Sequence, residues 1–338
     1  MSLNNLEEIA AFIVADGKGI LAADESNPTC GKRFDSIGVE STEQSRRDYR
    51  EMLFRSEGME ENIGGVILFD ETIRQSAADG TLLREIISDK NALPGIKVDK
   101  GLQAIKGCPG EMVTVGLEGL DKRLKEYSSF GAKFTKWRAV INIGEGLPSD
   151  KCIDLNMQAL ADYAKLAQDN EMVPIVEPEV LMDGDHALEQ CYEATERSLI
   201  SLFANLEKSG VNIKATLLKP NMITSGKDCS QQAGVDEVAS KTLKCLIRNV
   251  PDELPGITFL SGGQSDSLAT AHLDAMNKLG GFSWQLSFSY GRALQASALK
   301  AWGGKQENLS AAQDKFSHRA KMNKLASLGK WEEGLEVV

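Results

Sequence analysis

The chain has 338 residues, of which 42% are hydrophobic and 26% are charged, an ordinary composition for a globular protein. Its formal net charge of −11 argues against general nucleic-acid binding, because a phosphate backbone repels an acidic surface. No stretch approaches the roughly eighteen apolar residues that a membrane-spanning helix needs. We therefore expect neither a nucleic-acid partner nor a membrane partner.

The first segment of the chain predicts an amphipathic helix rather than a signal peptide. No basic residue precedes Lys18, and the apolar stretch is short and follows Glu7 and Glu8. We place this helix at about 3–15. The six cysteines form no CxxC pair, which is typical of reduced thiols in the cytosol. We therefore expect a cytoplasmic protein.

Short apolar segments predict eight strands, at 20–24, 65–69, 95–100, 133–140, 174–180, 215–222, 257–263 and 284–290. Helical patterns separate or follow them, at 41–56, 117–130, 153–170, 186–209, 235–250, 267–279, 293–302 and 308–328. Alternating strands and helices imply a parallel sheet with right-handed crossovers. Eight such units predict an α/β fold with one (β/α)8 TIM barrel over 1–338, ending in a short mobile tail at about 331–338.

The alternative to a closed barrel is an open, doubly wound sheet. That fold favours a glycine-rich turn after its first strand. The chain has Asp24-Glu25-Ser26-Asn27 at that position instead. The barrel is therefore the better prediction.

Charged residues stand at the ends of several predicted strands. Lys219 closes an apolar run just before Pro220, where desolvation favours the neutral amine that attacks carbonyl carbon. Strand side chains alternate, so Lys136 shares a face with Arg138. Glu177 and Glu179 share a face in the same way and offer carboxylates for acid–base chemistry or for ion pairs with the lysines. An ordinary lysine snorkelling from a strand end is the alternative for Lys219 taken alone.

The last two predicted strands end in glycine-rich segments that favour phosphate binding. Ser261-Gly262-Gly263 follows one strand, and Ser289-Tyr290-Gly291-Arg292 closes the other. Glycine lets the backbone approach an anion, and helix N-termini offer free N–H groups. TIM barrels frequently bind phosphate at these two loops, and the fork of Arg292 suits phosphate geometry.

The histidines give no sign of a metal centre. His186, His272 and His318 form neither an HxH nor an HxxxH pair, and none ends a predicted strand. A zinc-dependent mechanism would want several histidine ligands near the strand ends. We therefore predict a protein without a metal or any other cofactor.

The order of these motifs resembles class I fructose-bisphosphate aldolase, the metal-free Schiff-base family. The resemblance runs from about Gly17 to about Lys330 and rests on segments 17–26, 98–101, 136–138, 176–179, 217–222, 260–265 and 288–297. It implies a TIM barrel and reversible cleavage of fructose 1,6-bisphosphate to dihydroxyacetone phosphate and glyceraldehyde 3-phosphate, as in glycolysis and gluconeogenesis. The implied partners are small sugar phosphates, and we expect a homo-oligomer.

The resemblance also implies roles for individual residues. Lys219 would form the imine with C2 of the ketose, Glu177 would act as acid and base, and Asp24 would take the C4 hydroxyl proton. Lys136 would keep Lys219 from staying protonated, and Glu179 would help to position the lysines. The residues matching the C1-phosphate cradle are Ser261, Gly262, Gly263, Ser289, Gly291 and Arg292. Those matching positions around the far phosphate and hydroxyls are Ser26, Thr29, Arg33, Lys100 and Arg138.

The C-terminus departs from the family pattern. Many members end in a tyrosine that reaches into the site and assists proton exchange at C3, whereas the last tyrosine here is Tyr290. Two other readings remain open. One is another Schiff-base barrel of the transaldolase type, against which two phosphate sites argue. The other is a non-catalytic sugar-phosphate-binding scaffold, which would need none of the carbon–carbon chemistry.

Overall fold

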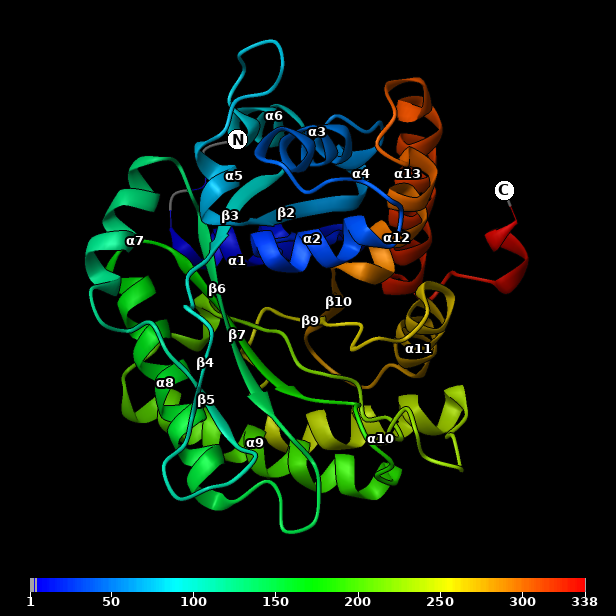
Figure 1. The fold of residues 1–338 in the computed structure, drawn as a ribbon. Helices are drawn as coiled ribbons and strands as arrows, with labels where there is room; N and C mark the ends of the chain where they lie inside the picture. The colour runs from blue at the N-terminus through cyan, green and yellow to red at the C-terminus, as the bar shows by residue number, and fades with distance from the viewer. Residues whose placement is uncertain (1–2, 4, 338) are drawn as a thin grey trace.

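A closed barrel of parallel strands forms the centre of the molecule in a computed structural model, which describes residues 3 and 5–337 (Figure 1). The strands follow one another around the barrel in the order β1-β10-β9-β8-β7-β6-β3-β2. Their bounds are β1 Gly19–Ala23, β2 Ile63–Leu68, β3 Leu93–Lys97, β6 Phe134–Ile141, β7 Val173–Val180, β8 Leu217–Leu218, β9 Gly256–Phe259 and β10 Gln285–Tyr290. The TIM barrel and its eight predicted strands are confirmed, and the open sheet is wrong.

The predicted helices are present, with ends that differ by a few residues. They are α1 Leu6–Val14, α3 Glu43–Phe54, α7 Leu120–Ser129, α8 Asp150–Asp169, α9 Leu188–Lys208, α10 Val235–Asn249, α11 Asp266–Leu279, α12 Arg292–Trp302 and α13 Leu309–Ser327. Residue 4, inside the range expected for the first helix, lies outside the described residues. Short 3-10 helices occur at η1 Ala15–Gly17, η2 Ile213–Ala215, η3 Gln306–Asn308 and η4 Glu333–Glu336.

Several short elements were not expected from the sequence. They are the helices α2 Asn27–Asp35, α4 Met59–Asn62, α5 Asp70–Arg74 and α6 Leu83–Asp89, and the antiparallel hairpin of β4 Leu102–Ala104 and β5 Met112–Thr114. The sequence of α2 is polar and shows no clear apolar stripe, although Pro28 occupies a first-turn position that proline favours. Strand β8 is shorter than expected because Pro220 has no N–H with which to continue the ladder.

Helix α1 closes the amino end of the barrel. Its buried residues Ile9, Ile13 and Val14 pack with apolar side chains from the inside of the strands. The contact is close: a Cβ atom at Gly64 of β2 would lie 2.1 Å from the carbonyl oxygen of Ile13. Any side chain at Gly64 would displace the helix. The amino end is therefore filled, and the interior opens only at the carboxyl ends of the strands.

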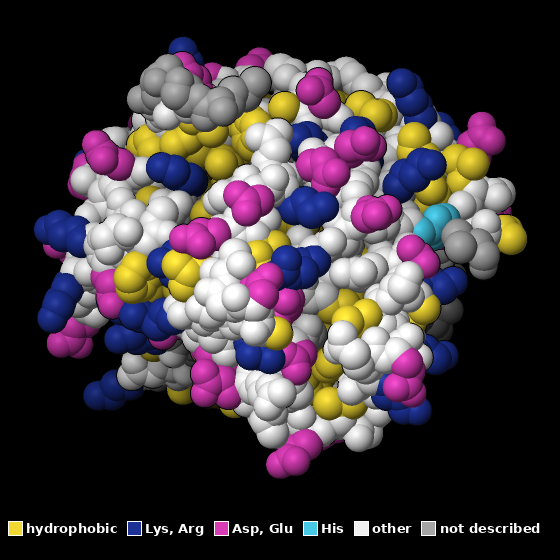
Figure 2. All heavy atoms as spheres, turned by 90° about the horizontal axis from the view of Figure 1, so that it is seen from above, with side chains coloured by type: hydrophobic (Ala, Val, Ile, Leu, Met, Phe, Trp, Pro, Cys, Tyr) yellow, Lys and Arg dark blue, Asp and Glu magenta, His cyan; other side chains and the backbone are white. Residues whose placement is uncertain are grey.

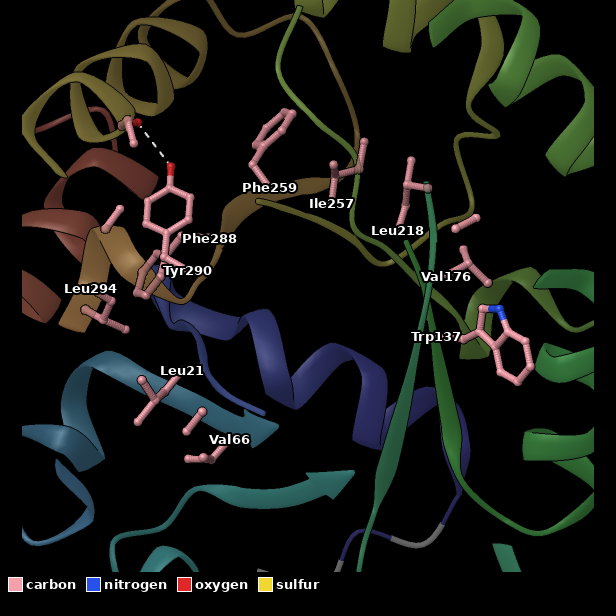
Figure 3. Packing of buried hydrophobic residues seen from close by; sticks show 14 of the residues in the cluster. Leu21, Val66, Trp137, Val176, Leu218, Ile257, Phe259, Phe288, Tyr290 and Leu294 are labelled. Atoms are coloured by element: carbon pink, nitrogen blue, oxygen red, sulfur yellow. Dashed lines mark hydrogen bonds between the residues drawn. The ribbon is translucent and has the colours of Figure 1, made fainter. Parts of the chain in front are cut away.

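A second apolar layer lies between the strands and the outer helices (Figure 3). The Trp137 ring of β6 stacks on Tyr163 of α8 with centroids 5.5 Å apart. Tyr290 of β10 is fully buried, and its hydroxyl donates to the Ala269 carbonyl of α11 at 3.1 Å. Such packing fixes each strand against its helix, so the side chains at the strand ends start from rigid positions.

The surface carries both signs of charge. Figure 2 shows one face on which basic and acidic side chains are interspersed, with small apolar patches between them. All six cysteine thiols are free. In the part of the chain that the structure describes, no helix is both long enough and apolar enough to cross a bilayer.

The segment after α13 lies against α11 and α13 (Figure 1). The backbone N–H of Trp331 donates to Asp274 at 2.9 Å, and its indole N–H donates to Glu336 Oε1 at 2.8 Å. Glu336 pairs with the buried Arg319, whose Nη2 also donates to Thr270 at 3.0 Å. These contacts tie down a segment that we expected to be mobile.

We expect Glu336→Gln to lower the free energy of unfolding by about 1–3 kcal/mol at pH 7, because it removes a charge-assisted bond to a buried guanidinium. Burial raises the pKa of Glu336, but Arg319 outweighs burial and holds the pKa below its ordinary value. This stabilisation is therefore complete above the unfolded-state pKa and is lost as the pH falls through the folded-state pKa.

Urea unfolding of the wild type and the variant between pH 7 and pH 4 measures the difference. Glu333→Gln, an exposed glutamate of the same turn, is the matched control and should stay within about 0.5 kcal/mol of the wild type. Equal losses in both variants would show that the Arg319 pair contributes nothing specific.

Candidate active site at the carboxyl end of the barrel

A cavity of about 320 Å³ opens where the carboxyl ends of the strands meet. Asp24 directly follows β1, and Lys219 directly follows β8. Of the residues predicted for the site, fourteen line this cavity: Asp24, Ser26, Thr29, Arg33, Lys136, Arg138, Glu177, Glu179, Lys219, Ser261, Gly262, Ser289, Gly291 and Arg292. The fold thus brings together residues from six strands, although the first and last of them, Asp24 and Arg292, are more than 200 positions apart in the chain.

Three buried charged residues and the partly buried Asp24 form a continuous chain at the bottom of the cavity. Lys136 Nζ lies 2.7 Å from Asp24 Oδ2 and 3.1 Å from Glu177 Oε2. Lys219 Nζ lies 3.1 Å from the other carboxylate oxygen of Glu177. The strand register makes this possible, since β6 and β7 are neighbours and Lys219 N–H donates to the Val176 carbonyl of β7 at 2.8 Å. Glu177 is therefore shared between the two lysines.

The chain of charges holds Asp24, Glu177 and Lys136 in their ionised forms. Burial by itself raises the pKa of Asp24, but Lys136 and then Lys219 outweigh it and hold that pKa below its ordinary value. Burial likewise raises the pKa of Glu177, and the same two lysines reverse the effect. Burial lowers the pKa of Lys136, yet Asp24 and Glu177 raise it above its ordinary value. At neutral pH a carboxylate therefore stands on each side of the Lys136 ammonium.

Glu179 has a different partner from the one expected. It forms an ion pair with Arg138, whose side chain is 41% exposed at the rim of the cavity. Its direct contact is therefore with a guanidinium at the rim, and it touches neither Lys136 nor Lys219 through an ion pair in the described part of the chain. Glu179 can orient Arg138 toward a substrate, which is not the role we expected.

The two glycine-rich loops lie side by side. A Cβ atom at Gly263 would lie 3.3 Å from Arg292 Nη2, so the absence of a side chain there leaves room for the guanidinium. Gly263 does not itself line the cavity, whereas Gly262 does, and both have left-handed φ angles, 93° and 57°. Ser289 is 1% exposed, and its hydroxyl has no hydrogen-bond partner within residues 3 and 5–337. Its hydroxyl is thus available to a ligand in the cavity.

A second polar group comes from the start of α2. Ser26 Oγ lies 3.0 Å from Thr29 Oγ1, and both hydroxyls line the cavity. Arg33 pairs with the buried Glu25. A Cβ atom at Gly291 would lie 3.5 Å from Arg33 Nη2, which places this guanidinium beside the loop that carries Arg292.

Lys100 was expected in the site, and the structure places it elsewhere. Strand β3 ends at Lys97, so Lys100 belongs to the connection toward the β4–β5 hairpin, where its N–H donates to the Val115 carbonyl at 2.8 Å. Its side chain is exposed and lines a separate surface depression with Gly116 and Gln103. Lys100 therefore lies outside the cavity that the other predicted residues line.

Three charged residues of the cavity were not predicted as site residues from the sequence: Glu25, Lys97 and Asp99. The Lys97 ammonium lies 5.2 Å from the centre of the Phe69 ring. The alternating Lys97-Val98-Asp99 pattern could have revealed that Lys97 and Asp99 share a face. Glu25 gave no such signal, because its role depends on contacts with Arg33 and Gln295 from elsewhere in the chain.

Metal-binding residues do not gather here. In residues 3 and 5–337 there is no group of three or more histidine, cysteine, aspartate or glutamate side chains arranged to hold a metal ion. The lining of the cavity instead contains several lysine and arginine side chains, whose positive charge suits anionic substrates.

Comparisons with known proteins identify the family of the chain. The family model "Fructose-bisphosphate aldolase class-I" matches residues 5–337. A protein of Xanthomonas campestris named "Probable fructose-bisphosphate aldolase class 1" is 54% identical over 333 residues, covering 98% of this chain and 100% of that protein. "Fructose-bisphosphate aldolase 4, cytosolic" of Arabidopsis thaliana is 50% identical over 321 residues, covering 95% of this chain and 82% of that protein.

A solved structure is similar over almost the same span. It is the fructose-bisphosphate aldolase of Plasmodium falciparum, in a ternary complex with TRAP and a small-molecule inhibitor. It has a TM-score of 0.96 and 46% identity, and the match covers 97% of this chain and 95% of that one. The chain is therefore an enzyme of the class I fructose-bisphosphate aldolase family, the lyases that cleave fructose 1,6-bisphosphate in glycolysis.

Proposed function

We propose that Lys219 is the residue that forms the Schiff base with C2 of fructose 1,6-bisphosphate, and that Glu177 moves the protons of that step. The observation that carries this proposal is the pair of 3.1 Å contacts through which Lys219 and Lys136 share Glu177. An amine beside a carboxylate and a second ammonium has both a proton acceptor and a neighbour that disfavours its own charge.

The reaction then divides among Asp24, Lys136, Glu177 and Lys219. Glu177 accepts the proton that Lys219 gives up on becoming a neutral amine, and that amine attacks C2. Glu177 then returns the proton to the carbinolamine hydroxyl, which leaves as water. Asp24 accepts the proton of the C4 hydroxyl as the C3–C4 bond breaks. The electron pair of that bond passes into the imine and gives an enamine. Glyceraldehyde 3-phosphate leaves, C3 is protonated, and hydrolysis of the imine releases dihydroxyacetone phosphate and restores Lys219.

The two phosphates would bind on the cationic side of the cavity. Ser261, Gly262, Ser289 and Arg292 would hold the C1-phosphate, with Gly291 allowing a close approach. Lys97, in place of Lys100, would act with Ser26, Thr29 and Arg33 at the far phosphate and hydroxyls. A non-catalytic scaffold would need only these cations, whereas the buried Lys136–Glu177–Lys219 chain serves carbon–carbon chemistry.

We also propose a cytosolic location and a homo-oligomer. The location is supported by the similarity to the relative of Arabidopsis thaliana that is named cytosolic. Apolar side chains on neighbouring outer helices support self-association, since Leu155 of α8 is 42% exposed and Ile200 of α9 is 56% exposed.

Borohydride reduction in the presence of dihydroxyacetone phosphate should attach a reduced triose phosphate to Lys219. The physical reason is that this amine lies beside Glu177, which can shuttle its protons. Peptide mass mapping locates the adduct, and protein treated with borohydride alone is the control. An adduct on Lys97 or Lys136 instead would contradict the assignment.

Arg292→Ala should raise KM for the bisphosphate and lower kcat/KM by about ten- to a hundredfold, because hydrogen bonds to charged groups contribute about 1.5–3 kcal/mol. Steady-state kinetics over a wide substrate range measures both constants.

Two lysine variants provide the comparison for the same assay. Lys97→Ala removes a cation that lines the cavity, and it should also raise KM. Lys100→Ala removes an exposed cation outside the cavity and should leave KM within about twofold. An unchanged KM in Arg292→Ala would mean that neither phosphate lies at the α12 loop.

Removal of the chain after Lys330 should leave bond cleavage and C3 proton exchange nearly intact, because residues 331–337 contact α11 and α13 and none of them lines the cavity. The proton for C3 would then come from Glu177, Glu179 or a water held by them. Tritium exchange from labelled dihydroxyacetone phosphate, measured below the melting temperature of the truncated protein, tests this. Loss of exchange with cleavage retained would show that the tail supplies the proton route.

A further inference from the structure

The side chain of Gln264 forms a hydrogen bond with the backbone of the loop that carries Ser261 and Gly262. Both the backbone N–H and Nε2 of Gln264 donate to the Ser261 carbonyl, each at 3.0 Å. The second amide hydrogen of Nε2 is directed to Met222 Sδ at 3.6 Å. Because both amide hydrogens are used, Oε1 of Gln264 is the atom that must receive a hydrogen bond from another group.

His272 of α11 supplies that hydrogen bond. Its Nδ1 lies 2.6 Å from Gln264 Oε1, and the side chain is 2% exposed. Since Oε1 can only accept, Nδ1 carries the proton. Its Nε2 is buried and has no hydrogen-bond partner in the described part of the chain. Burial lowers the pKa of His272 to about 4, so the ring is neutral at working pH and exists as the Nδ1–H tautomer.

The hydrogen bonds from His272 and Gln264 decide how one peptide group is oriented. The peptide between Ser261 and Gly262 is planar and trans, so its carbonyl and its N–H point in opposite directions. Holding the Ser261 carbonyl toward Gln264 therefore holds the Gly262 N–H on the opposite side of the same peptide. Gly262 lines the cavity and has a φ of 57°, a conformation that glycine adopts easily and leaves easily. The backbone N–H of Gln264 restrains this peptide, and the side-chain amide of Gln264 adds a second restraint on the same carbonyl.

We propose that His272 is a positioning residue for phosphate binding: through Gln264 it fixes the Ser261–Gly262 peptide, whose N–H is presented to a phosphate of the substrate. The inference rests on the proposed phosphate site at this loop. His272 itself touches neither substrate nor reacting atoms. Its contribution is to preorganise the loop, so that the ordering of a glycine-rich segment is not left to the substrate.

Three substitutions at His272 separate this role from simple filling of space. Asparagine places its amide nitrogen close to the position of Nδ1, so His272→Asn can still donate to Gln264. Glutamine places its amide near the position of Nε2, and leucine has no donor, so His272→Gln and His272→Leu both lose this hydrogen bond while retaining bulk. A donor at the Nδ1 position thus separates His272→Asn from the other two variants.

The expected result is a split between KM and kcat. His272→Gln and His272→Leu should raise KM for fructose 1,6-bisphosphate about five- to tenfold, the usual scale for one lost hydrogen bond. The inhibition constant of inorganic phosphate should rise in parallel. At saturating substrate, kcat and the borohydride adduct on Lys219 should stay within about twofold of the wild type. His272→Asn should restore both KM and the phosphate inhibition constant.

A double-mutant cycle tests whether the effect passes through Gln264. Gln264→Leu should raise KM by a similar factor, and the His272→Leu/Gln264→Leu double variant should be no worse than the worse single variant. Multiplying effects would mean that the two residues act separately, and they would overturn the inference. A lower melting temperature in His272→Leu with unchanged KM and phosphate inhibition would also overturn it, because His272 would then be only a core residue.

The Arg292→Ala variant keeps this test distinct from that of the proposed function. If Arg292→Ala raises KM and His272→Leu does not, the role of His272 is wrong and the phosphate site stands. If Arg292→Ala has no effect, the phosphate site itself is wrong. Should the leucine variant fail to fold, nitrogen NMR of the wild-type imidazole still decides, since a proton on Nε2 instead of Nδ1 would contradict the hydrogen bond to Gln264.

Discussion

The site depends on one buried carboxylate that serves two ammonium groups. Glu177 is 3% exposed and lies 3.1 Å from both Lys136 and Lys219. Breaking a buried ion pair by removing one partner costs about 3–5 kcal/mol, so loss of Glu177 would leave Lys219 without its partner, and loss of Lys136 would leave Asp24 without its partner. The same arrangement keeps Asp24 and Glu177 as carboxylates and Lys136 as an ammonium at neutral pH. Stability and chemistry therefore constrain the same atoms.

The barrel makes this concentration of charge tolerable. Helix α1 fills the amino end of the barrel with apolar side chains, and a second apolar layer packs the strands against the outer helices. The charged residues of the cavity consequently lie toward the carboxyl ends of the strands, where the strand register sets the distances between their side chains. Flexible loops could not hold Asp24 at 2.7 Å from Lys136 while excluding water, because long side chains would lose that geometry to entropy.

Two neutral glutamine side chains, Gln295 and Gln264, bind the backbone next to the charged residues of the cavity. Gln295 of α12 donates to the Ala22 carbonyl of β1 at 2.7 Å and to Glu25 at 3.2 Å, and it accepts from the Tyr49 hydroxyl. It thus connects the helix that begins at Arg292 with the strand that carries Asp24. Gln264 has a comparable place under the other loop. Amides suit this task because they donate and accept at once without adding charge to a crowded site.

The alternation of strand and helix was sufficient to predict the barrel, and the specific segments around Lys219, Glu177 and Arg292 were sufficient to predict where its cavity would be. These features are local, because hydrophobic periodicity and strand-end chemistry are written in consecutive residues. Tertiary structure alone decided the rest. Strand β3 ends at Lys97, which lines the cavity, whereas Lys100 does not. Glu179 pairs with Arg138 rather than with a lysine. His272 contacts Gln264 because its position in α11 places its ring against the loop that precedes this helix. Such pairings depend on the register and distance of separate elements, which no run of neighbouring residues encodes.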